Sequence, residues 1–150
     1  MGDYSLHAKR GHFIAFLLAV FDLQARTLSF ANAGQMKPLL ISDGNLNWLD
    51  AAGVHFPLGM KEDSVYTERS VQLRSGDVVC FLTDGITEAM NASLEQFSQE
   101  RIEHIMRTMD LRQLSARQIL DRVTDEVRRH VGDAAQHDDM TMVVVKVGAV

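Results

Sequence analysis

The boundary between strand and turn that is most informative about the fold lies in the stretch Val78-Val79-Cys80-Phe81-Leu82-Thr83-Asp84-Gly85. Its first five residues are apolar and include β-branched and aromatic side chains, a pattern typical of a strand. The run then gives way to Asp84-Gly85, a pair that favours a turn. We therefore predict a strand over residues 77–83 that ends beside a carboxylate, where a rigid scaffold can direct a side chain at a ligand.

The sequence before Asp84 predicts three antiparallel hairpins, because runs of strand character alternate with short polar stretches. Asp43-Gly44 is the strongest of the turn signals, since both residues tolerate the positive φ of a tight hairpin turn. Arg74-Ser75-Gly76 is the predicted third turn. The expected strand pairs are residues 13–21 with 27–33, 38–42 with 45–49, and 64–73 with 77–83.

The sequence after Asp84 changes to helical periodicity. Apolar residues at helical spacing predict a helix over 94–109, in which Met106 and Met109 fill the core. Ser115 and Gln118 resemble a capping box and begin a second helix that Gly132 ends. The valine-rich run 140–147 is predicted to be a central, buried strand. Hairpins followed by two helices and a return strand indicate an α+β fold with helices covering a sheet face.

Composition limits the classes of function. The 150 residues are 46% hydrophobic, which suits one domain with a core, and 20 acidic against 15 basic residues give a net charge of -5. The basic residues are scattered, so nucleic-acid partners are disfavoured, and the longest apolar run, 13–21, is too short to span a bilayer. The lone Cys80 suits a reducing cytoplasm. Residues 1–12 are interpreted as a lead-in, and 13–150 as the domain.

A second acidic site, Asp138-Asp139, opens the predicted last strand. If this strand neighbours residues 77–83, the carboxylates of Asp84 and Asp138 converge, and oxygen ligands of this kind suit Mg²⁺ or Mn²⁺. The alternative interpretation is structural, with Asp84-Gly85 as a turn and Asp138-Asp139 as a solvated loop.

Five short motifs together resemble one family. In order and spacing they are similar to motifs of the SpoIIE-like phosphatases, a bacterial form of the metal-dependent protein phosphatase (PPM, protein phosphatase 2C) superfamily. The resemblance covers about residues 13–147, the C-terminal part of that domain, and the Thr-Asp-Gly and Asp-Asp-x-Thr motifs are its most specific part. The motifs are Ala31-Asn32-Ala33-Gly34, Pro57-Leu58-Gly59, Leu73-Arg74-Ser75-Gly76-Asp77, Thr83-Asp84-Gly85-Ile86-Thr87-Glu88-Ala89 and Asp138-Asp139-Met140-Thr141.

The resemblance implies an antiparallel β-sandwich flanked by helices, with a two-metal centre of Mn²⁺ or Mg²⁺ at one end. Such centres hydrolyse phosphoserine or phosphothreonine by direct attack of a metal-activated water. Asp84 and Asp138 match ligands of one ion, and Asp139 orients the site or holds a further ion. Gly85 keeps the backbone open beside the metal. Asn32 and Gly34 either line the site or shape a strand end.

The sequence also departs from the family pattern. Members begin with strands and helices that carry an aspartate-glycine motif, whose aspartate bridges both metals, and no such motif is present. Gln35 stands where relatives commonly have histidine. We therefore expect the N-terminal strands and helices to be missing, in a truncated, mis-started or degenerate chain. A two-metal site that lacks the bridging ligand is expected to be weak or incomplete.

Two residues near the acidic motifs have competing interpretations. Glu88 follows the metal-site aspartate, and we favour its interpretation as part of a helix start, where negative charge suits the helix dipole. His137 has the chemistry of a proton shuttle, but a loop histidine beside carboxylates is commonplace, and the loop interpretation is favoured.

Three hypotheses about function follow from the sequence. The first is a metal-dependent serine/threonine phosphoprotein phosphatase, or the C-terminal part of one, acting on an anti-anti-sigma-type bacterial signalling regulator. The second is a catalytically inactive interaction module that binds such a regulator without turnover. The third is self-association through exposed sheet edges, because unpaired strands tend to pair.

Overall fold

The computed structural model describes residues 12–53 and 55–148 and has an α+β fold with antiparallel sheets. The chain divides into two compact units. The first unit contains residues up to Gln35 and Ala51–Gln72, and the second contains Met36–Asp50 and the residues from Leu73 onward. The predicted lead-in, residues 1–12, lies outside the described residues apart from His12. The elements are β1 (Phe16–Asp22), β2 (Thr27–Ala33), β3 (Leu39–Ser42), β4 (Asn45–Trp48), β5 (Ala52–Gly53), β6 (Tyr66–Thr67), β7 (Arg69–Gln72), β8 (Val78–Leu82), α1 (Asp84–Thr87), α2 (Gln99–Thr108), α3 (Ala116–Val131) and β9 (Met142–Lys146).

The first unit is built on a three-stranded antiparallel sheet in the order β1-β2-β7, with a short β5-β6 pair. The predicted first hairpin is confirmed as β1 and β2. Its turn is stabilised by Asp22, whose Oδ1 accepts the N–H groups of Gln24 and Ala25 at 2.9 and 2.8 Å. A short aspartate side chain that accepts backbone donors in this way replaces hydrogen bonds that the sheet does not supply at a turn.

The second unit holds a four-stranded antiparallel sheet in the order β4-β3-β8-β9. The predicted hairpin around Asp43-Gly44 is confirmed as β3 and β4, paired from Leu39↔Trp48 to Ser42↔Asn45. Asp43 and Gly44 have φ values of 49° and 78°. Positive φ at both central residues gives a two-residue turn whose twist matches that of the strands.

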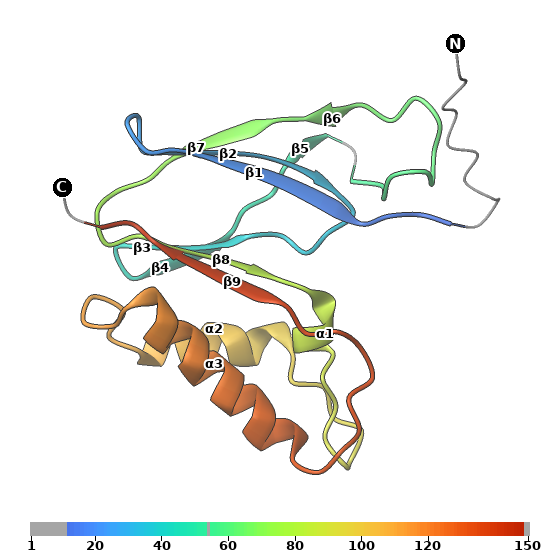
Figure 1. The fold of residues 1–150 in the computed structure, drawn as a ribbon, viewed down its shortest axis with the longest axis vertical. Helices are drawn as coiled ribbons and strands as arrows, with labels where there is room; N and C mark the ends of the chain where they lie inside the picture. The colour runs from blue at the N-terminus through green and yellow to red at the C-terminus, as the bar shows by residue number, and fades with distance from the viewer. Residues whose placement is uncertain (1–11, 54, 149–150) are drawn as a thin grey trace. The chain divides into compact units, whose positions relative to one another are not determined.

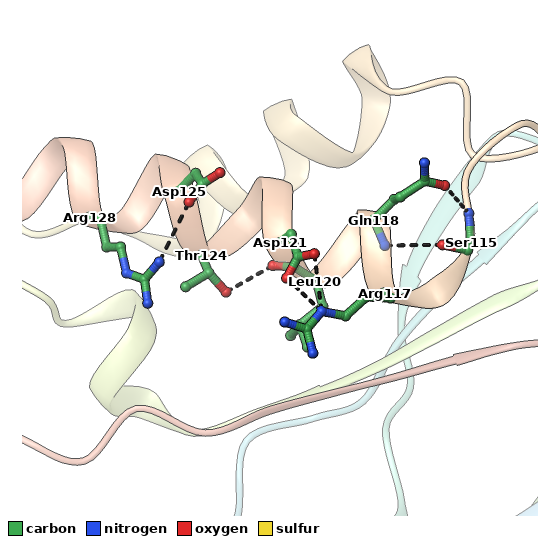
Figure 2. Close-up of polar contacts among 8 residues, drawn as sticks. All are labelled: Ser115, Arg117, Gln118, Leu120, Asp121, Thr124, Asp125 and Arg128. Atoms are coloured by element: carbon green, nitrogen blue, oxygen red, sulfur yellow. Dashed lines mark hydrogen bonds and ion pairs between the residues drawn. The ribbon is translucent and has the colours of Figure 1, made fainter.

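The helix α3 begins at the predicted capping box. Ser115 Oγ accepts the Gln118 N–H at 3.2 Å, and Gln118 Oε1 accepts the Ser115 N–H at 2.8 Å (Figure 2). These reciprocal bonds satisfy two donors that a helix start leaves unpaired. The helix ends at Gly132, which has φ 57°. No helix in the described part of the chain is long and apolar enough to cross a membrane.

The core of the second unit lies between its sheet and the helices α2 and α3, which cover one sheet face (Figure 1). Met106 and Met109 are buried in it, as predicted. Cys80 is also fully buried, and desolvation raises the pKa of its thiol from 9.0 to about 12. The buried residues of this cluster are Leu39, Ile41, Val78, Cys80, Leu82, Ile86, Ala89, Phe97, Ile102, Met106, Met109, Ile119, Val123 and Val127.

The predicted pairing of residues 64–73 with 77–83 is wrong. The first run forms β6 and β7, and β7 pairs with β2 in the sheet of the first unit. The second run forms β8, which pairs with β3 on one side and with β9 on the other. Because both edges of β8 are occupied, β7 has no place beside it. Arg74-Ser75-Gly76 therefore connects strands of two sheets.

The final strand was predicted to be central in its sheet, but it lies at the edge of the sheet. β9 is an edge strand among the described residues, where β8 is its one strand neighbour. Met142 and Val144 pack against the core, while Val143 between them is exposed. A valine-rich run is typical of a strand with both faces buried, but it does not specify how many neighbours the strand has.

The helix α2 begins at Gln99, five residues later than the predicted start at residue 94. Asn91 Oδ1 accepts the N–H groups of Ser93 and Glu95 at 2.9 and 3.0 Å, which holds this segment in a turn. Ser98 then has φ 73°, which is outside the helical region. Local side-chain to backbone bonds therefore compete successfully with the helix.

Candidate metal centre

The two acidic segments meet at one end of the second unit's sheet. The strands β8 and β9 are antiparallel, with Leu82 opposite Met142 as their last pair, so the end of β8 lies beside the start of β9. The pairing continues one step further, where the Thr83 N–H donates to the Thr141 carbonyl oxygen at 3.0 Å. Two segments that are remote in sequence are thus neighbours in space, as the hypothesis of a shared cation requires.

Thr83 connects these segments through its side chain as well. Its Oγ1 donates to the Asp139 carbonyl oxygen at 3.1 Å and accepts the Thr141 N–H at 2.9 Å. A hydroxyl can serve as donor and acceptor at once, which suits it to this position. This role of Thr83 was not predicted from the sequence. A threonine immediately before the strand-end aspartate is the signal that could have found it.

Gly85 allows the closest approach of the two segments. A Cβ atom at this position would collide with the Asp139 carbonyl oxygen and lie 3.4 Å from the Asp138 Cβ. Gly85 itself is buried. Glycine is needed here for space and not for an unusual φ, because only the absence of a side chain lets the backbones touch. The predicted role of Gly85 beside a metal ion stays a prediction.

The three carboxylates around this contact are exposed. Asp84 is the first residue of α1, and its Oδ1 accepts the Gly85 N–H at 3.1 Å. Asp138 Oδ1 accepts the Asp139 N–H at 2.7 Å. These short-range bonds restrict the side chains at the strand ends. The three exposed carboxylates lie beside the buried Gly85, so a ligand can reach them from solvent.

The interpretation of Glu88 as part of a helix start is wrong. The helix α1 is a single turn that ends at Thr87, and Glu88 is its C-cap residue. Its backbone N–H donates to the Asp84 carbonyl oxygen at 2.8 Å, and the Thr87 hydroxyl donates to the same oxygen at 3.1 Å. Thr87 and Glu88 therefore both hold the backbone of Asp84 in place through its carbonyl oxygen.

A pocket lies beside Gly85 in the second unit. Glu88, His137 and Asp138 contribute the charged or titratable part of its lining. His137 is exposed in the loop before β9, as the favoured interpretation expects. The remaining lining residues are Gly85, Ala89, Met90, Val131, Ala135, Gln136 and Met140.

The donor set fits a hard divalent cation in part. Carboxylate oxygens are the ligands that Mg²⁺ and Mn²⁺ prefer. However, no group of three or more histidine, cysteine, aspartate or glutamate side chains that could hold a metal ion is found within residues 12–53 and 55–148. The role of Asp84, Asp138 and Asp139 as metal ligands therefore stays a prediction.

Asn32 and Gly34, the predicted site-lining residues, lie in the first unit at the end of β2. Asn32 Nδ2 donates to the Gln35 carbonyl oxygen and its Oδ1 accepts the Gln35 N–H, both at 2.8 Å. Gly34 has φ 80°, and a Cβ there would approach the Pro57 ring to 2.5 Å. These contacts favour the alternative in which both residues shape a strand end. Their role in lining a site stays a prediction.

Solved structures define the fold class. The chain resembles the SiaA-PP2C domain of Pseudomonas aeruginosa, with a TM-score of 0.73 and 24% identity, over 88% of this chain and 51% of that one. It also resembles the phosphatase domain of SpoIIE from Bacillus subtilis, with a TM-score of 0.69 and 22% identity, over 90% of this chain and 59% of that one. The fold is that of protein phosphatase 2C domains.

Sequence comparison then identifies the family. Residues 3–148 match the family described as Stage II sporulation protein E (SpoIIE), and the chain belongs to this family. Protein IcfG of Synechocystis sp. is 30% identical over 141 residues, 93% of this chain. Phosphoserine phosphatase RsbU of Bacillus subtilis is 24% identical over 138 residues, 89% of this chain. The matched parts are 21% of IcfG and 39% of RsbU, so the chain spans less than half the length of either relative.

Proposed function

We propose that this chain is a metal-dependent serine/threonine phosphoprotein phosphatase, or the C-terminal part of one, with Mn²⁺ or Mg²⁺ held by Asp84 and Asp138. The proposed substrate is a phosphoserine or phosphothreonine protein of the anti-anti-sigma type in a bacterial cytoplasm. One observation carries the proposal. The pairing of β8 with β9 brings the segments Asp84-Gly85 and Asp138-Asp139 together at one end of the sheet, where Gly85 lies against the Asp139 backbone.

Relatives support the same reaction class. RsbU carries the name phosphoserine phosphatase, and one structure of the SpoIIE phosphatase domain comes from crystals presoaked with manganese. These properties belong to those proteins. They favour a phosphorylated serine as the substrate group and manganese as the first metal to test in this chain.

The chain's own residues would prepare the site before any ligand binds. Thr83 fixes the separation of the two segments, and Thr87 and the Glu88 N–H anchor the turn that carries Asp84. Divalent cations at such a site neutralise phosphate oxygens and lower the pKa of bound water. Asp139, beside Asp138, would orient the site or hold a further ion. The ordering is useful because a carboxylate that is already positioned loses less conformational freedom when it binds an ion.

Manganese binding tests the proposal without relying on turnover. We expect Mn²⁺ titration, followed by calorimetry or by the electron paramagnetic resonance signal of free Mn²⁺, to show a weak site. Asp84→Asn and Asp138→Asn should each weaken binding by at least tenfold, because each removes a charged ligand. Asp133→Asn, which changes an exposed loop aspartate, is the matched control. Equal Mn²⁺ affinity in all four proteins would refute the assignment of the two ligands.

Hydrolysis is the second measurement. We predict that the chain hydrolyses a generic aryl phosphate slowly or not at all, even with millimolar Mn²⁺, because its described ligand set is incomplete. Robust Mn²⁺-dependent turnover that Asp84→Asn abolishes would overturn the prediction of an incomplete site and support a working phosphatase.

A catalytically inactive module that binds the phosphorylated regulator is the second candidate. The absence of a three-residue ligand group among the described residues favours it. It requires binding of a serine-phosphorylated regulator that needs no metal and survives Asp84→Asn, with no release of phosphate. Binding that depends on Mn²⁺ and is lost with Asp84→Asn would instead favour the enzyme.

A further inference from the structure

His130, in the last turn of α3, joins this helix to two other segments of the second unit. Its Nε2 lies 2.9 Å from the Glu95 carbonyl oxygen, in the loop of residues 88–98 between α1 and α2. Its Nδ1 lies 2.9 Å from Nη1 of Arg101 in α2. The ring also packs edge-on against buried Phe97, with 5.4 Å between the ring centres. We call His130 with these three partners the His130 junction.

The two polar partners determine the protonation state of the ring. A guanidinium only donates hydrogen bonds, so Nδ1 of His130 accepts from Arg101 and carries no proton. A carbonyl oxygen only accepts, so Nε2 donates to Glu95 and carries the proton. The bonding pattern therefore fits one state of the side chain, the neutral imidazole with its proton on Nε2.

A proton on Nδ1 would break this arrangement. Arg101 would lose its acceptor, and two positively charged donors would face each other. The end of a helix favours a positive charge through its dipole, but that effect is spread over the last turn, whereas the guanidinium is in direct contact with the ring. The bond from Arg101 is therefore available only to the neutral form of His130.

Two acidic residues are placed to answer a positive charge on the ring, and both are already engaged. The Glu95 carboxylate accepts from Asn91 Nδ2 at 2.9 Å within the loop. Glu126, one helical turn before His130, forms an ion pair with Arg129 at 2.6 Å. Neither carboxylate could offset the repulsion between an imidazolium and the guanidinium without giving up its present partner.

The loop of residues 88–98 is bonded to the turn that carries Asp84. The Phe97 N–H donates to the Ala89 carbonyl oxygen at 2.8 Å, and the Ser98 N–H donates to the Thr87 carbonyl oxygen at 2.7 Å. The loop and α1 therefore form one hydrogen-bonded piece of backbone, and what holds the loop also holds the turn at the candidate metal centre.

The His130 junction also connects two sides of the pocket beside Gly85. Ala89 and Met90 of the loop line this pocket, and so does Val131, which follows His130 in α3. The bond from the ring to the loop therefore fixes these lining residues relative to one another.

We propose that His130 is a positioning residue for the candidate metal centre and that its charge controls the loop of residues 88–98. The neutral ring holds the loop on α3 and α2. A proton taken up from solvent at Nδ1 breaks the bond from Arg101, and the loop loosens together with the turn that carries Asp84. Histidine is the side chain whose charge ordinarily changes between about pH 5 and 8, which is the range to examine. The effect on the metal rests on the proposed function, whereas the His130 junction does not.

The state of the ring is tested by NMR of the ¹⁵N-labelled imidazole nitrogens, which distinguishes the two neutral tautomers from the imidazolium. At about pH 8 we expect His130 to be neutral with its proton on Nε2. The signals that are missing in His130→Gln assign the residue. A proton on Nδ1 at this pH would overturn the proposal.

Hydrogen exchange followed by mass spectrometry tests the loop, with rates corrected for the intrinsic effect of pH. Between about pH 8 and about pH 5.5, residues 88–98 should lose about tenfold in protection, the effect of losing a charge-assisted bond. His130→Gln should not show this loss, because its amide offers a donor and an acceptor that do not titrate. His104→Gln, at an exposed histidine of α2, should behave like the natural protein. Constant protection in the natural protein, or the same loss in His130→Gln, rejects the proposal.

Arg101→Met separates this repulsion from a merely structural role of the ring. It should lower protection of the loop at about pH 8, because one bond is lost. It should also remove most of the dependence on pH, since a protonated ring without this neighbour can still donate to Glu95. A full pH effect in Arg101→Met would contradict the mechanism. Circular dichroism checks that each variant folds.

Manganese affinity at the same two pH values tests the effect on the candidate metal centre. It should fall further with acidification in the natural protein than in His130→Gln, because all other histidines are the same in the two proteins. Equal falls would rule out the positioning role. If neither protein binds Mn²⁺ while the exchange results hold, the proposed metal function fails and the His130 junction stands.

Discussion

The Thr83 hydroxyl and the Asp139 carbonyl oxygen form a hydrogen bond of 3.1 Å, although 56 positions separate the two residues. The same hydroxyl oxygen accepts the Thr141 N–H at 2.9 Å. One side chain therefore fastens the start of β9 to the end of β8 at the candidate metal centre. Thr83→Val keeps the shape of the side chain but removes both bonds. We expect the free energy of unfolding to fall by about 1–2 kcal/mol, since water can reach the exposed partners and replace part of the loss.

Urea unfolding measures this effect. Thr83→Ser is the matched control, because it retains the hydroxyl and should lose less than Thr83→Val. The two variants should also differ in Mn²⁺ affinity, with the valine variant weaker. If Thr83→Val is as stable as the natural protein, the hydroxyl does not hold the segments together.

Gly85→Ala tests the contact between the backbones of the two acidic segments. Gly85 lies in α1, and alanine is favoured over glycine in helices by about 1 kcal/mol. The added methyl group would, however, collide with the Asp139 carbonyl oxygen and approach its carbonyl carbon to 3.1 Å. Both are backbone atoms that cannot move aside as a side chain can, so we expect a net loss of about 1–3 kcal/mol.

Gly148→Ala provides the comparison for this change, because a Cβ there would meet no atom within 4 Å. Its midpoint in urea unfolding should be close to that of the natural protein. A Gly85→Ala protein that is more stable than the natural one would mean that helix propensity outweighs the collision, and that the two segments are farther apart than described.

Lys146 connects the last strand to the loop between α2 and α3. Its Nζ donates to the carbonyl oxygens of Leu111, Arg112 and Leu114 at 2.9, 3.0 and 2.6 Å. Lys146→Met keeps the length of the aliphatic stem and removes all three bonds. Hydrogen bonds from a charged donor each contribute more than neutral ones, so we expect a loss of about 1.5–3 kcal/mol in the free energy of unfolding.

Lys37→Met is the control for this variant. The Lys37 ammonium pairs with exposed Asp50 at 2.9 Å, and surface pairs of this kind contribute about 0.2–1 kcal/mol. Thermal or urea unfolding should therefore show that Lys146→Met is much less stable than Lys37→Met. Equal losses would show that the three carbonyl contacts of Lys146 do not stabilise the fold.

Local signals in the sequence predicted the elements that are determined by their own residues. Asp43-Gly44 specifies a tight turn because both residues accept positive φ, and Ser115 with Gln118 specifies a helix start because their side chains satisfy its free donors. The same reasoning failed at the start of α2. There Asn91 and the positive φ of Ser98 compete with a helical pattern that is otherwise sound.

Long-range relationships were harder to predict. Adjacency along the chain suggested that residues 64–73 pair with 77–83, but the partners of β8 are β3 and β9. Which strands become neighbours is decided by burial over the whole sheet, and a local window does not contain that information. The proximity of Asp84 and Asp138 was expected only if β8 and β9 are neighbours. The contacts of Thr83 and Gly85 with Asp139 join residues more than 50 positions apart, so no local pattern predicts them.

Cys80 makes the stability of the protein depend on pH in the alkaline range. Burial raises the pKa of its thiol from 9.0 to about 12 in the fold. Below pH 9 the thiol is protonated in both the folded and unfolded states, so it causes no pH dependence. Between pH 9 and about 12 the unfolded chain releases the proton while the folded protein keeps it. The free energy of unfolding should therefore fall as pH rises through this window, with a limiting slope of about 1.4 kcal/mol per pH unit.

Cys80→Ala isolates this contribution, because it removes the ionisable group at the cost of a small cavity. The variant is expected to be less stable at pH 7, and its stability should fall less steeply between pH 9 and 10.5, the lower part of the window from 9.0 to about 12. In the natural protein, the thiol should also react with Ellman's reagent at pH 8 only as fast as the protein unfolds. Rapid reaction under native conditions, or equal slopes for the two proteins, would mean that the thiol is not sealed in the core.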